Sequence, residues 1–379
     1  MIPPAEIERR YSNLRSRMQA SKLDALLVCG NQYTGFEGAV RYVSGFEIVH
    51  RYVYVVIPLA GDPVLLFPSE ARWIGDKAKP WVKEHVWADV PGEWLREQAR
   101  ARGWKRLGVY GMDFILTVRD YRALAAAELE LVPFDFEFDI ARAVKSPAEL
   151  DCIRDSMSII VDGFWALLKA YRPGKTEAEI MAPAVELFFA RGAGPRMMNI
   201  VLSGTHGEAD AHFKVPGQRV VEPDDLLLYS LELGGSDGYW VEFSRPVIQG
   251  KPSARTQKMM DIYPEAVEAA RMKMRGGERA SSVHRAFAEI FARHGFSFGH
   301  LSGHSIGNTM IEHPAIGAKN DTVLEENMVL AFHPQAVDTD GKVCLYMQDT
   351  YRVGKSEGEC LASVPWQFFR GDEVRADRK

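Results

Sequence analysis

The stretch Gly238-Tyr-Trp-Val-Glu-Phe-Ser-Arg245 decides how the second half of the chain is interpreted. Its aromatic and β-branched residues are typical of a strand. The glycine-rich turn Gly234-Gly-Ser-Asp-Gly238 separates it from a second strand-like segment, Asp225–Leu233. One acidic residue stands in each predicted strand, Glu232 before the turn and Glu242 after it. These two side chains are therefore the first candidates for a functional site.

Upstream of this strand, the sequence predicts that a new domain begins near Ser146. Ser146-Pro-Ala-Glu149 combines a helix N-cap, a proline at the first helical position and a glutamate at the capping-box position. Apolar residues then recur at helical spacing from Leu150 to Leu167. Further helices are expected over Thr176–Arg191, Ser253–Arg275 and Ser281–His294, and further strands over Met197–Leu202, Met328–Phe332 and Val343–Val353. We therefore expect an α+β domain over residues 144–379, with helices packed on a mainly antiparallel sheet.

The first 143 residues alternate helical and extended segments, which predicts a separate α/β domain over residues 1–143. Ile7–Ala20 has the pattern of an amphipathic helix, and Leu23–Gly30 that of a buried strand. Tyr52–Pro58 and Pro63–Phe67 flank a short turn, which predicts a hairpin. Arg106–Tyr110 is expected to be a further strand.

The composition excludes several classes of protein. With 46 Lys and Arg against 51 Asp and Glu, the net charge of −5 gives no electrostatic reason to expect a nucleic-acid partner. The chain has no run of about 18 apolar residues, so no membrane span is expected. Four distant cysteines form no CxxC pair and predict neither a disulfide framework nor a cysteine-based zinc site. The sequence thus favours a cytoplasmic protein without a membrane partner.

Candidate acid, base and ligand groups gather in the second domain, on or beside the predicted strands. They are His206 and His212; Glu232 and Glu242; His304, followed by Glu312 and His313; and His333, followed later by Gln348 and Asp349. A single histidine in a strand is more often structural than functional. The order and spacing of the whole set are specific, however, and they point to one site.

The sequence resembles the pita-bread family of creatinase, prolidase, aminopeptidase P and methionine aminopeptidase from about residue 5 to residue 364. The motifs that carry the resemblance are Lys145-Ser-Pro-Ala-Glu149, Gly238–Arg245, Gly303-His-Ser-Ile-Gly307 and Asn327-Met-Val-Leu-Ala-Phe-His-Pro334. The resemblance implies an N-terminal creatinase-like α/β domain, a C-terminal pita-bread catalytic domain and a homodimer.

The metallopeptidases of this family bind two metal ions through two Asp, one His and two Glu. By the resemblance, His304 takes the histidine position and Glu242 the second Asp position, while the first Asp position falls at Leu231 or Glu232. The sequence leaves open whether Glu232 faces the pocket, because a one-residue shift in register turns a strand side chain to the other face.

The two glutamate positions of the family are also changed. His333 stands where the family has a glutamate before proline, and Gln348 stands where it has the bridging glutamate. Because Gln348 is neutral and His333 offers a single nitrogen, an intact dinuclear site is not expected. Glu242, His304 and His333 could form a mononuclear site for zinc or ferrous iron. The alternative, which the sequence favours, is that no metal is required.

Creatinase, which has also lost the ligand carboxylates, supports that alternative. It hydrolyses a C–N bond with a histidine as acid and base, and the residue at that position here is His212. Imidazole suits this role because its pKa lies near neutral pH. Arg51 matches the arginine that creatinase contributes across its dimer to the substrate carboxylate. Ser244 replaces the glutamate that contacts the guanidino group of creatine, so creatine itself is not expected as the substrate.

The leading hypothesis is a metal-independent hydrolase of a C–N bond in a small, carboxylate-bearing, non-peptide molecule. Its catalytic residues would be His212, Glu242 and His304. The residues expected to contact the substrate are Arg51, Glu232, His333, Gln348 and Arg245. Two alternatives remain: a metal-dependent Xaa-Pro peptidase-like enzyme or lyase with one ion at Glu242, His304 and His333, and a catalytically inactive binding protein on the same fold.

Overall fold

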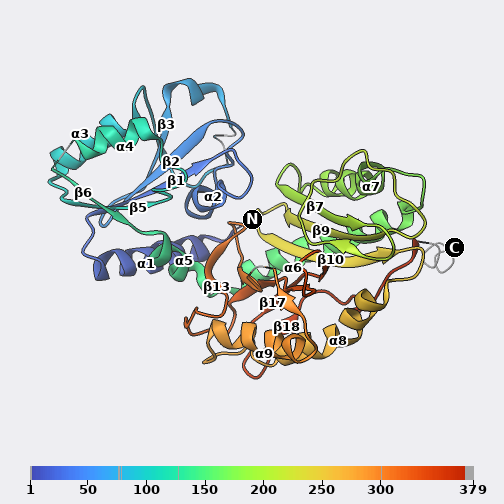
Figure 1. The fold of residues 1–379 in the computed structure, drawn as a ribbon. Helices are drawn as coiled ribbons and strands as arrows, with labels where there is room; N and C mark the ends of the chain where they lie inside the picture. Colours follow the sequence, from blue (N-terminus) through green and yellow to red (C-terminus); the bar gives the residue numbers. More distant parts are fainter. Residues whose placement is uncertain (1, 76, 78, 127, 300, 372–379) are drawn as a thin grey trace. The chain divides into compact units, whose positions relative to one another are not determined.

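The computed structural model describes residues 2–75, 77, 79–126, 128–299 and 301–371. The chain divides into two compact units (Figure 1). The first is Met1–Arg142 together with Asn308–Met310, and the second is Ala143–Gly307 together with Ile311–Lys379. Each unit is a mixture of helices and strands with its own buried apolar cluster.

The N-terminal unit is built on a six-stranded sheet with the order β4-β3-β2-β1-β5-β6. The strands are β1 Ala25–Asn31, β2 Tyr52–Pro58, β3 Val64–Pro68, β4 Glu84–Ala88, β5 Arg106–Tyr110 and β6 Glu130–Pro133. β1 pairs with β2 antiparallel and with β5 parallel. The predicted hairpin is confirmed, because β2 and β3 are antiparallel neighbours.

Helices cover this sheet on both faces (Figure 1). They are α1 Pro4–Ala20, α2 Gly38–Ser44, α3 Pro91–Arg102, α4 Val118–Ala125 and α5 Asp135–Ala143. α1 and α5 lie side by side, joined by an ion pair of 3.2 Å between Arg17 and Glu137. Six of the seven residues of β1 are buried, as expected for a central strand between two helical layers.

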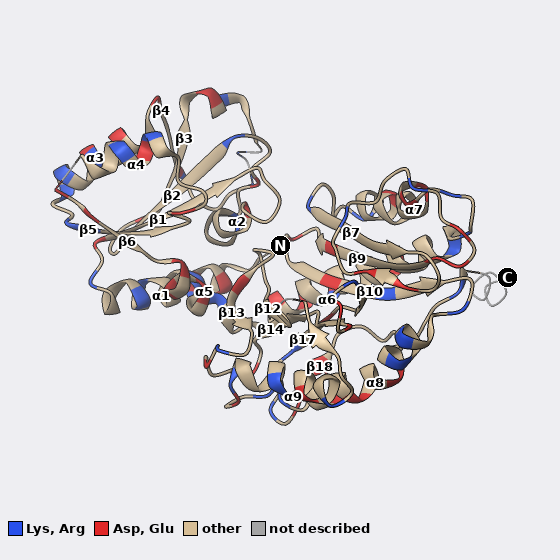
Figure 2. Cartoon of the chain, viewed as in Figure 1, with Lys and Arg blue, Asp and Glu red and all other residues tan. Residues whose placement is uncertain are grey.

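The helices of the C-terminal unit confirm the predicted positions. They are α6 Pro147–Ala170, α7 Glu177–Ala190, α8 Ala254–Arg271 and α9 Ala280–Arg293. The predicted capping box is present at the start of α6: Ser146 Oγ accepts from the backbone N–H of Glu149, and the Glu149 carboxylate accepts from that of Ser146. Figure 2 shows basic and acidic residues interspersed along helices of both units, for example α3 and α8.

Three antiparallel sheets form the rest of this unit, with the orders β10-β9-β7, β11-β15-β16-β8 and β13-β12-β14-β17-β18. The strands are β7 Met197–Gly204, β8 Ala209–Asp210, β9 Leu226–Gly234, β10 Trp240–Ile248, β11 Ser297–Phe298, β12 Gly303–Ser305, β13 Glu312–Ile316, β14 Val329–Phe332, β15 Gln335–Val337, β16 Val343–Tyr346, β17 Asp349–Arg352 and β18 Glu359–Cys360. α6 packs against β9 and β10, whose residues are all buried, while α8 and α9 pack together over the other two sheets.

One predicted strand is interrupted where the sheets meet. Val343–Val353 was expected to be continuous, but it forms β16 and β17, which are separated at Gln348. The backbone of Gln348 pairs with Ser244 of β10 instead, with N···O distances of 3.1 and 3.4 Å. The backbone pairing of Gln348 with Ser244 therefore links the β9–β10 pair to the sheet that contains β14 and β17.

No helix in the described part of the chain is both long enough and apolar enough to cross a membrane.

Candidate active site

Two buried carboxylates face each other across β9 and β10. Glu232 and Glu242 are directly opposite in the antiparallel register, and their residues are 6% and 2% exposed. Both carboxylates approach the same side-chain nitrogen, Gln348 Nε2, at 3.3 Å from Glu232 Oε1 and 3.0 Å from Glu242 Oε2. The structure thus answers the question that the sequence left open: Glu232 and Glu242 belong to one site.

Gln348 lies at the centre of this site and is fully buried. Its Nε2 also lies 2.8 Å from the hydroxyl oxygen of Tyr346, and its Oε1 accepts a hydrogen bond of 2.6 Å from Ser230. Thr350 fixes the backbone of Glu242, because its Oγ1 accepts from the N–H of Glu242 and donates to the carbonyl. Gln348 therefore contacts both carboxylates, Ser230 and Tyr346 hold Gln348, and Thr350 holds the backbone of Glu242.

Two histidines approach Glu242 from the neighbouring sheet. His304 Nε2 lies 3.4 Å from Glu242 Oε1, and His333 Nε2 lies 3.9 Å from Glu242 Oε2. His304 is on β12, and His333 directly follows β14, where its N–H donates to the carbonyl of Ser302. The two rings are 5.1 Å apart between centroids. The pairing of β12 with β14 is what brings both imidazoles to the same carboxylate.

A glycine makes this pairing possible. Gly303 has a φ of 154°, and a Cβ atom there would lie 2.0 Å from the carbonyl oxygen of Ala331. Any side chain at this position would push β12 away from β14. The glycine in Gly303-His-Ser-Ile-Gly307 thus sets the position of the adjacent His304.

The protonation of His304 can be inferred from its contacts. Its Nδ1 lies 3.0 Å from the carbonyl oxygen of Ser305. A carbonyl can only accept, so Nδ1 carries a proton, and Nε2 is the nitrogen that faces Glu242. This is the arrangement typical of a metal-ligating histidine, whose second nitrogen donates to a backbone carbonyl.

The geometry fits one metal ion. Glu242, His304 and His333 each offer one ligand atom, and these atoms all lie within 4.8 Å of one another. A carboxylate with two imidazoles suits zinc or ferrous iron. A second ion would have to be held by Glu232 together with the neutral amide of Gln348, whose N–H groups point at the carboxylates. The donors present therefore do not fit a dinuclear centre.

The electrostatics of the metal-free pair also favour a cation. Burial raises the pKa of Glu232 to about 7, although hydrogen bonds from Gln348 and Ser230 oppose the rise. Burial and the nearby charge of Glu232 raise the pKa of Glu242 well above its usual value. Two carboxylates in such a site prefer to share a proton or to bind a positive charge.

Arg245 lies away from this site. Side chains alternate along a strand, so Arg245 and Glu242, three residues apart, project from opposite faces of β10. The Arg245 guanidinium is fully buried and forms an ion pair of 2.8 Å with Asp349. It also donates to the backbone carbonyls of Val364 and Pro365 and stacks on Trp366 at 4.0 Å. These contacts give Arg245 a structural role, and its predicted contact with the substrate stays a prediction.

His212 lies on the loop after β8. Its imidazole is 79% exposed, and its Nδ1 lies 2.8 Å from Asp210 Oδ1. The next residue, Phe213, packs against Tyr346, whose hydroxyl contacts Gln348. The loop is thus linked to the site by one aromatic contact, while the catalytic role of His212 stays a prediction.

Arg51 belongs to the N-terminal unit. It directly precedes β2, is exposed and has a φ of 68°. Its predicted contact with a substrate carboxylate stays a prediction.

Sequence reasoning missed Ser230 and Tyr346. A usable signal was present, because Ser230 precedes Glu232 by two residues and Tyr346 precedes Gln348 by two. Positions two apart on a strand share a face. The period of two therefore could have placed both hydroxyls beside the residues that the motifs identified.

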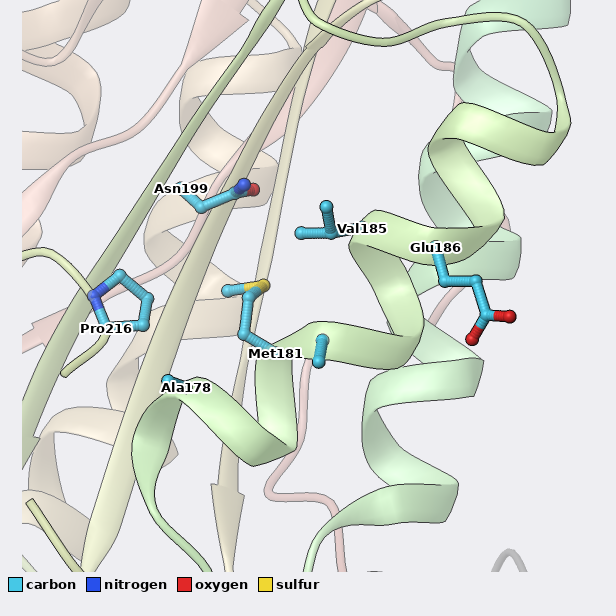
Figure 3. A pocket seen from close by; sticks show the side chains of 7 residues that line it. Ala178, Met181, Val185, Glu186, Asn199 and Pro216 are labelled. Carbon is cyan, nitrogen blue, oxygen red and sulfur yellow. The ribbon is translucent and has the colours of Figure 1, made fainter. Parts of the chain in front are cut away.

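Figure 3 shows a separate hollow on the surface of α7. The side chains of Met181 and Val185 face Asn199 of β7 across it. Its lining residues are Ala178, Met181, Ala182, Val185, Glu186, Asn199 and Pro216. None of them belongs to the cluster around Glu242, and the lining is mostly apolar. The candidate ligand and acid–base side chains thus lie at the Glu242 site and not in this hollow.

Two family profiles match the chain. Residues 151–355 match the family described as Metallopeptidase family M24, and residues 10–144 match the Creatinase/Prolidase N-terminal domain. These matches confirm the predicted fold class, with a creatinase-like N-terminal domain and a C-terminal pita-bread domain.

Individual proteins of the same kind are similar over most of their length. An Xaa-Pro dipeptidase of Lactobacillus delbrueckii subsp. lactis is 26% identical over 80% of this chain and 84% of its own. Among solved structures, an Xaa-Pro dipeptidase from Bacillus anthracis has a TM-score of 0.80 at 22% identity, over 96% of this chain and 99% of its own. The prolidase from Pyrococcus horikoshii OT3 has a TM-score of 0.79 at 22% identity, over 95% and 99%. At these identities the two structures show the fold alone.

Proposed function

The chain belongs to metallopeptidase family M24 and is a hydrolase of that family, and we propose that it cleaves a C–N bond in short peptides with one divalent ion held by Glu242, His304 and His333. The relatives named above are Xaa-Pro dipeptidases and a prolidase, so dipeptides that end in proline are the first substrates to test. These names favour a metal-dependent Xaa-Pro peptidase-like enzyme over metal-independent cleavage of a non-peptide molecule.

One observation carries the proposal: a carboxylate and two imidazoles lie with their ligand atoms within 4.8 Å in a buried cluster. When bound, such an ion supplies Lewis-acid polarisation of a carbonyl oxygen and acidifies water. The Nδ1–carbonyl contact of His304 fixes the tautomer that this ligand set requires. The buried surroundings exclude bulk water and strengthen every charge interaction with the substrate.

The remaining groups of the site have separate proposed roles. Glu232 is the second carboxylate, and we assign to it the proton that water releases as its oxygen bonds to the substrate carbonyl carbon. His212 donates a proton to the nitrogen as the C–N bond breaks. Glu232 then releases the proton it took from water, and the exposed His212 takes one from solvent, which resets the site. Gln348 keeps both carboxylates in place through its amide N–H groups. A homodimer, and a contact of Arg51 with the substrate carboxylate across it, remain part of the proposal.

The test is metal analysis paired with activity. Protein purified without chelator is analysed by mass spectrometry for metal content, and then assayed on alanyl-proline, on a dipeptide without proline and on N-acetylglycine. We expect about one ion per chain, cleavage of alanyl-proline, loss of activity on chelation and recovery when the metal is returned.

A matched pair of variants completes the experiment. Glu242→Gln should lose the ion, whereas Glu186→Gln, in the exposed hollow on α7, should keep it. Turnover that is unaffected by complete metal removal would overturn the metal assignment and return the creatinase-like mechanism. Tight binding of the dipeptide without turnover, with or without added metal, would identify an inactive binding protein.

A further inference from the structure

We propose that the amide group of Gln348 takes the place of a second cation between Glu232 and Glu242, and thereby limits the centre to a single metal ion. The inference deepens the proposed function, on which it rests for the ion at Glu242, His304 and His333. The position it concerns is the one between Glu232 and Glu242, next to the proposed ion.

The geometry places Gln348 Nε2 where a positive charge is most needed. The nitrogen lies 3.3 Å from Glu232 Oε1 and 3.0 Å from Glu242 Oε2, between carboxylates that are opposite each other in the sheet. Both carboxylates are buried, so water does not screen their repulsion. Amide N–H groups that donate to carboxylates form charge-assisted hydrogen bonds, which are stronger than neutral ones. One neutral group therefore compensates part of two negative charges.

The orientation of the amide is fixed by its surroundings. Ser230 Oγ lies 2.6 Å from Gln348 Oε1 and 3.0 Å from Glu232 Oε1, so its single hydroxyl proton goes to one of these two acceptors. The opposite orientation would direct the carbonyl oxygen at two carboxylates, which is electrostatically unfavourable. The backbone of Gln348 is fixed as well, because its N–H and C=O both pair with Ser244. The backbone pairing and the side-chain contacts together hold the N–H groups toward the carboxylates.

Because glutamine and glutamate have the same length, a single substitution at Gln348 could turn this position into a metal site. Glutamate has the same number of heavy atoms as glutamine, so Gln348→Glu exchanges the N–H donors for a carboxylate oxygen without a change of shape. Three carboxylates would then converge in one buried site, a situation that a divalent cation relieves. We expect the substitution to create a second ion site formed by Glu232, Glu242 and the new carboxylate.

The experiment counts metal ions in the full-length protein, with Mn²⁺ or Zn²⁺ alone as the probe. Wild type and Gln348→Glu are saturated by equilibrium dialysis, and the bound metal is measured by mass spectrometry and by calorimetric titration. Gln19→Glu, which adds the same charge at an exposed position on α1, is the control. We expect one ion for wild type and for the control, and two for Gln348→Glu.

The outcomes separate this inference from the proposed function. One ion in both wild type and Gln348→Glu would overturn the role of Gln348 and leave the proposed metal site standing. No ion in wild type with one in Gln348→Glu would overturn the proposed metal site and support the role of Gln348. No ion in either would overturn both.

A second variant keeps the inference testable if Gln348→Glu does not fold. Gln348→Met keeps the length of the side chain but removes both N–H groups. In the presence of chelator we expect it to melt at a lower temperature than wild type, and the added substitution Glu232→Gln to restore much of the loss. An unchanged melting temperature for Gln348→Met would contradict the compensating role of the amide.

Discussion

Glu232 and Glu242 lie opposite each other on β9 and β10, and both carboxylates approach the single nitrogen Gln348 Nε2. Two buried carboxylates in register repel each other unless a proton, a donor or a cation lies between them. The structure supplies the amide of Gln348 between them, the Ser230 hydroxyl beside Glu232 and two imidazoles beside Glu242. This relationship determines how the protein should respond to pH, to metal and to substitution.

The first prediction concerns the pH dependence of stability in the metal-free protein. Burial raises the pKa of Glu232 to about 7, above the value of about 4.3 expected in the unfolded chain. Because the folded state binds this proton more tightly, its contribution to stability is complete below pH ~4.3 and is lost as the pH rises through 7. The loss should be on the order of 4 kcal/mol, at 1.36 kcal/mol per pKa unit.

Thermal unfolding in chelator, from pH 4.5 to pH 8, measures this effect. Glu232→Gln removes the titrating group, so its melting temperature should fall less than that of wild type over the same range. Parallel pH profiles for the two proteins would show that the proton on Glu232 does not contribute to folding.

The second prediction concerns metal affinity. His304→Ala removes one of three proposed ligands, and we expect affinity for the metal to fall by a factor of about 100 or more, since even outer-shell substitutions at metal sites cost 10–100-fold. Turnover should fall with it. His313→Ala, an exposed position on β13, is the control and should keep both properties. Equal metal binding by the two variants would remove His304 from the site.

The sequence alone predicted most of the fold, because the signals are local. The capping box at Ser146, the hairpin of β2 and β3 and the strands that carry Glu232 and Glu242 follow from spacing and residue type. The interruption of the strand at Gln348 could not be predicted in this way. It results from pairing with Ser244, which is about a hundred residues earlier in the chain and belongs to another sheet.

The candidate site was predicted by its motifs and refined by its contacts. Glu242, His304, His333 and Gln348 do meet, as their order and spacing within the family motifs predicted. The side of the strand on which Arg245 lies, in contrast, could have been deduced from the sequence, since an odd separation from Glu242 on one strand implies the opposite face. The face of β9 on which Glu232 lies depends on the register between β9 and β10, and only the structure supplies that register.

The third prediction tests His212 as the proton donor to the leaving nitrogen. Its imidazole is 79% exposed and bonded to Asp210, so His212→Ala should leave the fold intact while turnover falls by orders of magnitude. His206→Ala is a matched control, because His206 is 85% exposed and lies 3.0 Å from Asp224 in the same kind of pair. The measurement is kcat of both variants under steady-state conditions. A wild-type kcat in His212→Ala would exclude His212 from the mechanism.

The fourth prediction separates a structural from a substrate-binding role for Arg245. Its ion pair with Asp349 is fully buried, so Arg245→Met leaves an uncompensated carboxylate in the core. Breaking a buried pair in this way costs about 3–5 kcal/mol. We therefore expect a lower melting temperature, together with an unchanged KM in the protein that remains folded. Asp349→Asn with Arg245→Met should recover part of the stability, because the double variant removes the unpaired charge. A KM raised at least tenfold in folded Arg245→Met, with stability unchanged, would instead place the guanidinium against the substrate.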